Sequence, residues 1–207
     1  MSADQATVFV VDDDDAMRSS LRWLIESVGL MVKTFDSALD YLEAFDPDEA
    51  GCLVLDVRMP GMSGMELLEN LSAYPLRPPV IIITGHGDVP MAVRAIKYGA
   101  LDFIQKPFND QELLDRIQQA LDTDARNRQE MAGLDNLKSR YDALTPRERQ
   151  IMDMVAAGKS NKVVASELEI SSRTVEVHRA RIMKKLKVKT LADLVQANLQ
   201  LGSKAAG

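Results

Sequence analysis

Short apolar runs recur through the first 121 residues and alternate with stretches of helical period. Residues 16–28 and 90–98 carry apolar positions three and four apart, which is typical of amphipathic helices. The short runs are rich in β-branched residues, and several lack alternation, as in strands that are buried on both faces. Strands alternating with helices predict an α/β fold with a doubly wound parallel sheet. The five predicted strands are residues 7–11, 31–35, 52–55, 80–84 and 102–105.

Helical patterns alone follow the last of these strands. A helix capped by Asp110 is expected to begin there, with its leucine and isoleucine positions on one face. Residues 122–143 are polar, have little apolar periodicity and contain one glycine, which predicts a partly helical linker. Thr145, Pro146 and Glu148 then form a helix start with a capping box. A small all-α domain of four helices is expected, at residues 146–157, 161–168, 173–186 and 191–201.

Charge divides the chain in the same way as the hydrophobic pattern. Residues 1–121 hold 20 acidic and 9 basic side chains, whereas residues 144–207 hold 6 acidic and 12 basic ones. The segment between them is nearly neutral. We therefore expect an acidic domain at 1–121, a linker at 122–143 and a basic domain at 144–207. A basic domain of this size favours a polyanionic partner such as nucleic acid.

Composition excludes several other classes of protein. The longest apolar runs, such as residues 80–83, are far shorter than the roughly 20 residues that span a bilayer. The single cysteine, Cys52, excludes an internal disulfide and a multi-cysteine metal site. The expectation is a soluble, cytoplasmic protein without a membrane partner.

Acidic residues follow two of the predicted strands. In a doubly wound sheet, ligands bind at the carboxyl ends of the strands. Asp12 and Asp13 follow the first strand and Asp56 follows the third, so three carboxylates should meet there. An oxygen-rich site without cysteine or histidine favours Mg²⁺ over zinc. Beside such a cation, a carboxylate can act as a nucleophile toward a phosphoryl group.

Two further strand ends supply groups that a phosphoryl transfer needs. Thr84 offers a hydroxyl and Lys106 an ammonium group to phosphoryl oxygens. Lys106 precedes Pro107, and a cis peptide bond at that position is expected. Asp14 and Asp15 precede a helix, and we interpret them as its cap and first turn. Asp14 also lies close enough to the predicted site to affect metal affinity or the lifetime of a phosphoryl group.

The motifs "VVDDD", "LVLDVRMPGMSGMELL" and "VIIITGHGDVPMAVRAIKYGALDFIQKPF", in this order, resemble the receiver domain of two-component response regulators. The resemblance covers residues 5 to about 121 and implies a flavodoxin-like sheet with strand order 2-1-3-4-5. It also implies that Asp56 is the phosphoacceptor and that Thr84 and Lys106 contact the phosphoryl oxygens. Phe103 stands at the aromatic switch position, although core packing explains it equally well. The implied Mg²⁺ ligands are Asp12, Asp13, Asp56 and the backbone carbonyl of Arg58.

Two alternatives to a phosphorylated regulator follow from the same residues. An aspartate-nucleophile phosphohydrolase needs a second aspartate two residues after its nucleophile, but Val57 and Arg58 follow Asp56. Asp12 and Asp14 have that spacing, but Ala16 stands where that family has Thr or Val. The other alternative is a constitutive DNA-binding regulator that uses its receiver only for dimerisation. A missing metal carboxylate or lysine would favour this constitutive alternative, and none is missing. We therefore expect a phosphorylated regulator that is not an enzyme beyond its own phosphorylation and slow dephosphorylation.

Residues 144–196, "LTPRERQIMDMVAAGKSNKVVASELEISSRTVEVHRARIMKKLKVKTLADLVQ", resemble the helix-turn-helix domain of the LuxR type. Together with the receiver motifs they resemble the NarL/FixJ group of response regulators, and its FixJ type in particular. The second helix of the motif, residues 173–186, is expected to lie in the major groove of DNA. The residues on its outward face are Arg173, Glu176, Val177, Ala180, Arg181 and Lys184.

Other side chains of this domain are better placed for phosphates, which position a protein without specifying sequence. They are Lys162, Ser172, Thr174, His178, Lys184 and Lys185. Arg179 is expected either to read bases or to contact phosphates. His178 lies beside the apolar seam and is as readily a partly buried core residue. Glu176 is expected to accept from cytosine or to exclude wrong sites.

The resemblance implies how the two domains work together. A sensor histidine kinase would phosphorylate the receiver. Thr84 and Lys106 would then move toward the phosphoryl group, Phe103 would repack, and the surface of the fourth helix and fifth strand would form a homodimer, with Val93, Arg94 and Lys97 as the contact residues. The dimer would present two recognition helices to two half-sites in promoter DNA. RNA polymerase is the further expected partner.

Overall fold

The computed structural model describes residues 6–85 and 89–202, and the chain divides into two compact units between Arg128 and Gln129. Each unit is described by itself. Residues 86–88, which belong to the receiver motif "VIIITGHGDVPMAVRAIKYGALDFIQKPF", lie outside the described residues. In the described ranges, no helix is long and apolar enough to cross a membrane.

The first unit contains a five-stranded sheet in which all strand pairs are parallel. The strand order is β2-β1-β3-β4-β5, which confirms the predicted doubly wound, flavodoxin-like arrangement. Its central strands are buried on both faces, which explains why their apolar runs do not alternate. The strands are β1 (Thr7–Val11), β2 (Met31–Phe35), β3 (Gly51–Asp56), β4 (Val80–Thr84) and β5 (Asp102–Gln105).

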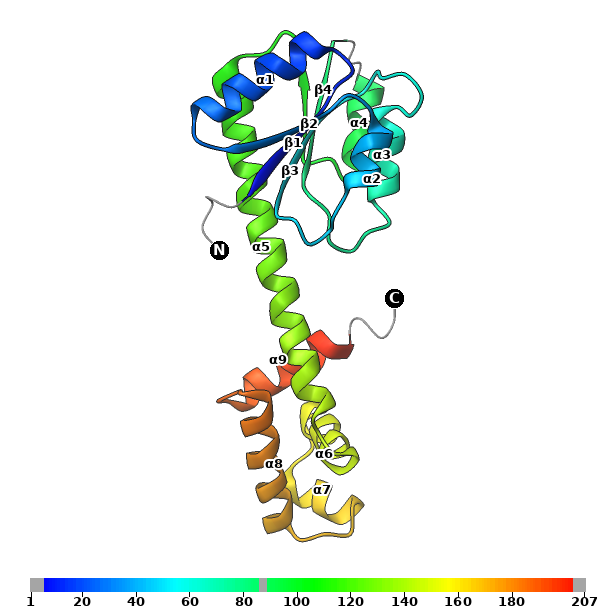
Figure 1. The fold of residues 1–207 in the computed structure, drawn as a ribbon. Helices are drawn as coiled ribbons and strands as arrows, with labels where there is room; N and C mark the ends of the chain where they lie inside the picture. The colour runs from blue at the N-terminus through cyan, green and yellow to red at the C-terminus, as the bar shows by residue number, and fades with distance from the viewer. Residues whose placement is uncertain (1–5, 86–88, 203–207) are drawn as a thin grey trace. The chain divides into compact units, whose positions relative to one another are not determined.

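Helices cover the sheet on both sides (Figure 1). On one face, α1 (Asp15–Ser27) and α5 (Asp110–Asp142) contribute residues such as Ile25 and Ile117 to a buried cluster. On the other, Tyr41, Leu68 and Ala95 form a second cluster with inward side chains of the strands. These residues come in turn from α2 (Ala38–Ala44), α3 (Gly64–Leu71) and α4 (Val89–Lys97).

Helix ends follow the sequence signals with one exception. Asp14 caps α1 as predicted, because its side chain accepts hydrogen bonds from the Ala16 and Met17 amides. The expectation that Asp110 caps α5 is wrong. Asn109 Oδ1 accepts from the amides of Gln111 and Glu112, at 2.8 and 3.3 Å, which makes Asn109 the cap. Both residues are good cap formers, so their adjacency left the sequence signal ambiguous.

The predicted linker is helical along almost its whole length, because α5 continues to Asp142. Long-range contacts stabilise both of its ends. Arg128 donates to Asp124 and to the carbonyl oxygens of residues 47–49 in the first unit. Leu137 belongs to the core of the second unit, and Arg140 donates to the Leu186 carbonyl oxygen. Such tertiary contacts are absent from the local pattern on which the partly helical prediction rested.

The second unit packs four further helices around the end of α5. They are α6 (Pro146–Ala156), α7 (Asn161–Glu167), α8 (Ser172–Leu186) and α9 (Leu191–Gly202). Thr145 and Glu148 form the predicted capping box at the start of α6. The core of this unit includes Ile151, Val164, Val175 and Ile182.

Candidate functional site

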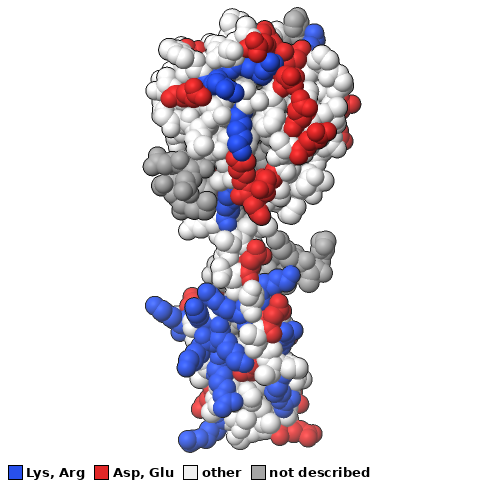
Figure 2. Space-filling model, in the orientation of Figure 1, with Lys and Arg blue, Asp and Glu red and all other residues white. Residues whose placement is uncertain are grey.

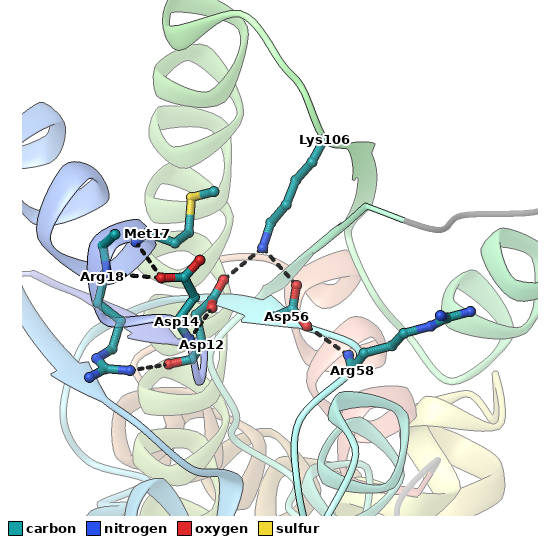
Figure 3. Close-up of polar contacts among 8 residues, drawn as sticks. Asp12, Asp14, Met17, Arg18, Asp56, Arg58 and Lys106 are labelled. Atoms are coloured by element: carbon teal, nitrogen blue, oxygen red, sulfur yellow. Dashed lines mark hydrogen bonds and ion pairs between the residues drawn. The ribbon is translucent and has the colours of Figure 1, made fainter.

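Three predicted site residues lie together where strands of the sheet end (Figure 3). Val11 of β1 is paired with Leu55 of β3. Asp12 follows Val11 and Asp56 follows Leu55, so the two aspartates lie side by side at this edge of the sheet. Lys106 follows β5, and its Nζ lies 2.7 Å from Asp12 Oδ2 and 2.7 Å from Asp56 Oδ1. The lysine thus bridges two carboxylates that are 44 positions apart in the sequence.

The backbone holds the second oxygen of each carboxylate. Asp12 Oδ1 accepts from the Asp14 amide at 2.9 Å, and Asp56 Oδ2 accepts from the Arg58 amide at 2.7 Å. Asp12 and Asp56 are both buried. Each carboxylate therefore has one oxygen on a backbone N–H and the other on Lys106, which fixes its orientation.

Burial and charge oppose each other in this cluster. Burial raises the pKa of the Asp56 carboxyl, while the hydrogen bond and charge of Lys106 act to lower it. For Lys106, burial acts to lower the pKa, but the hydrogen bonds and charges of Asp12 and Asp56 raise it above the usual value of lysine. The lysine is therefore protonated at neutral pH. One ammonium against two carboxylates leaves the site attractive to further positive charge.

The donor chemistry of the cluster fits a hard divalent cation. Asp12 and Asp56 offer oxygen only, and a single cation, the Lys106 ammonium, already reaches both. Asp13, the third predicted carboxylate, has an exposed side chain. Within the described part of the chain, three or more acidic, histidine or cysteine side chains nowhere gather closely enough to hold a metal. The full set of Mg²⁺ ligands therefore stays a prediction.

The remaining predicted residues of this site lie on β4 and β5. Thr84 ends β4 and is buried, and its carbonyl oxygen accepts from the Lys106 amide at 2.8 Å. The Lys106–Pro107 peptide bond is cis, as predicted. Phe103 is partly buried and packs against the core cluster beneath α4. Its core packing is thus observed, whereas its switch role stays a prediction.

Sequence reasoning missed Arg18 as a member of the site. Its Nη1 donates to the Asp12 carbonyl oxygen at 2.7 Å, and its Nη2 contacts Asp15 at 3.0 Å. The guanidinium therefore holds the turn that follows β1 (Figure 3). The available signal was the spacing of Asp15 and Arg18 by three residues on a helix, which places the two side chains side by side.

The second candidate surface is the outward face of α8. All six residues predicted to read bases there are exposed. Figure 2 shows lysine and arginine side chains gathered over this part of the second unit. Three of the cations on α8 have no side-chain hydrogen bond or ion pair among the described residues: Arg173, Arg181 and Lys184. They stay available to an anionic partner.

Other predicted DNA contacts on α8 already have partners or are partly buried. Lys185 Nζ lies 2.6 Å from Glu148 Oε2 and donates to the Ala143 carbonyl oxygen. Arg179 Nη1 donates to Asn161 Oδ1 at 2.6 Å. His178 Nδ1 is buried and has no hydrogen-bond partner within the described ranges. The remaining predicted contact on α7, Lys162, is exposed, and Ser172 and Thr174 in the first turn of α8 are partly exposed.

Comparisons with known proteins assign both parts of the chain to families. Residues 8–118 match the family described as response regulator receiver domain, and residues 142–197 match that of the bacterial regulatory proteins of the luxR family. Nodulation protein W of Bradyrhizobium diazoefficiens is 48% identical over 97% of this chain and 88% of its own length. The transcriptional regulatory protein FixJ of the same organism is 44% identical over 94% of this chain and 95% of its own length.

Solved structures extend the likeness to three dimensions. The response regulator StyR is 49% identical and has a TM-score of 0.82, covering 95% of this chain and 99% of that one. Full-length FixJ from B. japonicum is 43% identical and has a TM-score of 0.57, covering 96% and 98% of the two chains. The chain therefore belongs to the two-component response regulators with a LuxR-type DNA-binding domain, and it is a transcriptional regulator of the FixJ type.

Proposed function

We propose that Asp56 accepts a phosphoryl group from a sensor histidine kinase and that the phosphorylated chain binds promoter DNA as a homodimer. The observation that carries the first part is the position of Lys106, which contacts both Asp12 and Asp56 at 2.7 Å. This arrangement places a cation beside a buried, oriented carboxylate. Both are needed when two anions, a carboxylate and a phosphoryl group, must meet.

In the transfer, a carboxylate oxygen of Asp56 forms a bond to phosphorus while the bond from phosphorus to the kinase histidine breaks. The imidazole leaves with the electron pair of that bond. Lys106 and the Thr84 hydroxyl bind the phosphoryl oxygens, and the Arg58 amide keeps the Asp56 carboxylate in place. The chain catalyses no reaction other than its own phosphorylation and slow dephosphorylation.

The group that the family implies here is Mg²⁺, and the oxygen donors of the site support it. Asp12, Asp13, Asp56 and the backbone carbonyl of Arg58 would hold it. When bound, Mg²⁺ screens the negative charges of the carboxylates and of the phosphoryl group. The Asp14 amide, which donates to Asp12 Oδ1, would hold this ligand in place.

The domain limits are also a proposal: a receiver at 1–121, a linker at 122–143 and a DNA-binding domain at 144–207. In the second domain, α8 would enter the major groove, with Arg173, Arg181 and Lys184 contacting bases or phosphates. Val177 and Ala180 would permit close approach to bases. Lys162, Ser172 and Thr174 would contact phosphates. Lys185 and Arg179 already have protein partners, which favours structural roles for both.

Dimerisation is proposed to use α4, where Val93, Arg94 and Lys97 are all exposed. Two further apolar side chains, Val89 and Ile96, are exposed on the same helix. Paired subunits would present two recognition helices and gain affinity through effective concentration. RNA polymerase at the promoter and a cytoplasmic location complete the proposal.

Asp56→Asn tests the phosphoacceptor directly. With acetyl phosphate and Mg²⁺, the unmodified chain should gain one acid-labile phosphoryl group, and Asp56→Asn should gain none, as measured by intact-mass spectrometry. Asp48→Asn, which changes an exposed carboxylate of the same unit, should be phosphorylated normally. Phosphorylation of Asp56→Asn would show that the nucleophile lies elsewhere. Equal DNA binding with and without acetyl phosphate would instead favour the constitutive alternative.

A further inference from the structure

Arg179 differs from the other arginines of α8 in its position on the helix. It follows buried Val175 by four residues and precedes buried Ile182 by three. Residues three and four apart share one face of a helix, so Arg179 lies beside the inward seam. Arg173 and Arg181, by contrast, belong to the exposed face. The position alone places Arg179 away from the surface that would meet DNA bases.

The side chain of Arg179 connects the two helices of the helix-turn-helix motif. Its Nη1 donates to Asn161 Oδ1 at 2.6 Å in a part-buried contact across 18 positions of sequence. Asn161 is the first residue of α7, directly after the cap Ser160. Hydrogen bonds from a charged donor are short and roughly twice as strong as neutral ones. This bond therefore ties the start of α7 to the middle of α8.

The bond between Arg179 and Asn161 also affects the position of the neighbouring residue Lys162. Lys162, the predicted phosphate contact on α7, directly follows Asn161 and is exposed. Phosphate contacts set the register of a protein on DNA, whereas contacts to base edges specify the sequence. To select a DNA site, the protein must therefore hold Lys162 on α7 and the base-reading residues of α8 at a fixed distance from each other.

We propose that Arg179 is a positioning residue, which fixes α7 to α8 through Asn161, and that it makes no contact with DNA itself. The proposal rests on the DNA-binding role of α8. It replaces the two roles expected from sequence, base reading and phosphate contact, by a third. Loss of the bond should reduce the preference for a specific site and leave general attraction to DNA unchanged.

The test compares Arg179→Ala, Asn161→Ala and the double variant in the full-length chain treated with acetyl phosphate. The probes are a duplex selected by the unmodified protein from a random-sequence pool and a duplex of scrambled sequence. Each single variant should bind the selected duplex about 10-fold more weakly, and the double variant no more weakly than the singles, because the two residues act as one unit. Affinity for the scrambled duplex should change less than about twofold, and the salt dependence should keep its slope, because no phosphate contact is lost.

Asn161→Ala is the decisive variant because it removes the bond without removing a charge. If Arg179→Ala lowers the unfolding temperature below that of the assay, Asn161→Ala alone carries the test. Arg181→Ala is the matched control, and it should lower the salt slope by about 0.9. The proposal is overturned if Arg179→Ala lowers the slope as Arg181→Ala does, or if Asn161→Ala leaves the preference between the two duplexes intact. If Arg181→Ala also has no effect on either duplex, the DNA-binding role of α8 fails, and this proposal fails with it.

Discussion

The carboxyl edge of the sheet and the outward face of α8 handle charge in opposite ways. At the sheet edge, Lys106 is paired with two buried carboxylates, and backbone amides hold the remaining oxygens. On α8, Arg173, Arg181 and Lys184 are exposed and have no charged partner among the residues that the structure describes. The charges at the sheet edge are thus paired within the protein, whereas these three cations of α8 are unpaired among the described residues.

The difference follows from what each surface has to bind. A covalent transfer needs reacting atoms held in one geometry, and fixed dipoles supply that most effectively when they are partly buried. Binding to a polyanion gains affinity when cations displace condensed counterions, which requires cations that are not already neutralised. The five predictions that follow test whether paired and unpaired charges behave as differently as this comparison requires.

The largest effect is expected at Lys106. Lys106→Ala should slow the phosphorylation of Asp56 by acetyl phosphate by about 10²-fold, because it removes the one cation that contacts Asp56 among the described residues. Rates are measured by intact-mass spectrometry over time. Lys33→Ala removes an exposed ammonium of the same unit that pairs with Glu49 and contacts no site residue, and it should leave the rate within about twofold. A normal phosphorylation rate for Lys106→Ala would show that the pairing of Lys106 with the carboxylates does not prepare the site for the transfer.

The meeting of Asp12, Asp56 and Lys106 was predictable because the carboxyl ends of parallel strands share one edge of the sheet. That Lys106 bridges both carboxylates was not, since it depends on how a flexible side chain settles between charges from distant segments. The exposure of Asp13 could not be predicted from the sequence either. Two adjacent aspartates carry the same local signal, and only the packed turn separates their surroundings.

Long-range partners also explain what the helical pattern left open. Arg179 and Arg181 are two positions apart and chemically identical, but Asn161, 18 positions away, distinguishes them. The full length of α5 likewise depends on Arg128 and Arg140, whose partners lie about 80 and 46 positions away. Periodicity identifies which residues share a face, and it contains no information on partners in other elements.

The next largest effect tests a cation of α8 that is paired. Glu148 is buried and accepts from Lys185 at 2.6 Å and from the Thr145 amide at 2.8 Å. Glu148→Ala should lower the free energy of unfolding of the second unit by about 2 kcal/mol, because it removes the half of the capping box that accepts from the Thr145 amide and leaves Lys185 without its carboxylate. Urea unfolding followed by circular dichroism measures the change. Glu169→Gln, which alters an exposed glutamate of that unit, should change the unfolding free energy by less than about 0.5 kcal/mol.

The same pair predicts a pH dependence. Burial acts to raise the pKa of Glu148, but the hydrogen bonds and charge of Lys185 and the Thr145 contacts lower it below the usual value. A folded pKa below the unfolded one means that the stabilisation is complete above about pH 4.5 and is lost as the pH falls through the lowered pKa. The difference between the unmodified chain and Glu148→Ala should therefore shrink in strong acid. A constant difference down to pH 2 would contradict the ion pair.

A fourth prediction compares an unpaired and a paired cation on one helix. Arg181→Ala should weaken binding to a selected duplex about 10-fold, which corresponds to about 1.4 kcal/mol. Lys185→Ala should weaken binding less than threefold while lowering the unfolding temperature, because its ammonium is held by Glu148. Fluorescence anisotropy and thermal unfolding give the two quantities. Equal losses of affinity would mean that Lys185 leaves Glu148 to contact DNA.

The smallest effect concerns Asp14, which lies beside the prearranged site but acts on it through the backbone. Its side chain caps α1, so Asp14→Ala should lower the free energy of unfolding of the first unit by about 1 kcal/mol, and Asp14→Ser, which keeps a cap, by less. Its amide, however, is the group that donates to Asp12 Oδ1, and every variant except proline retains that amide. The rate of phosphorylation by acetyl phosphate should therefore change less than about threefold in both variants. A loss as large as that of Lys106→Ala in both would mean that the Asp14 carboxylate itself acts at the site, and the division between capping and site aspartates would then be wrong.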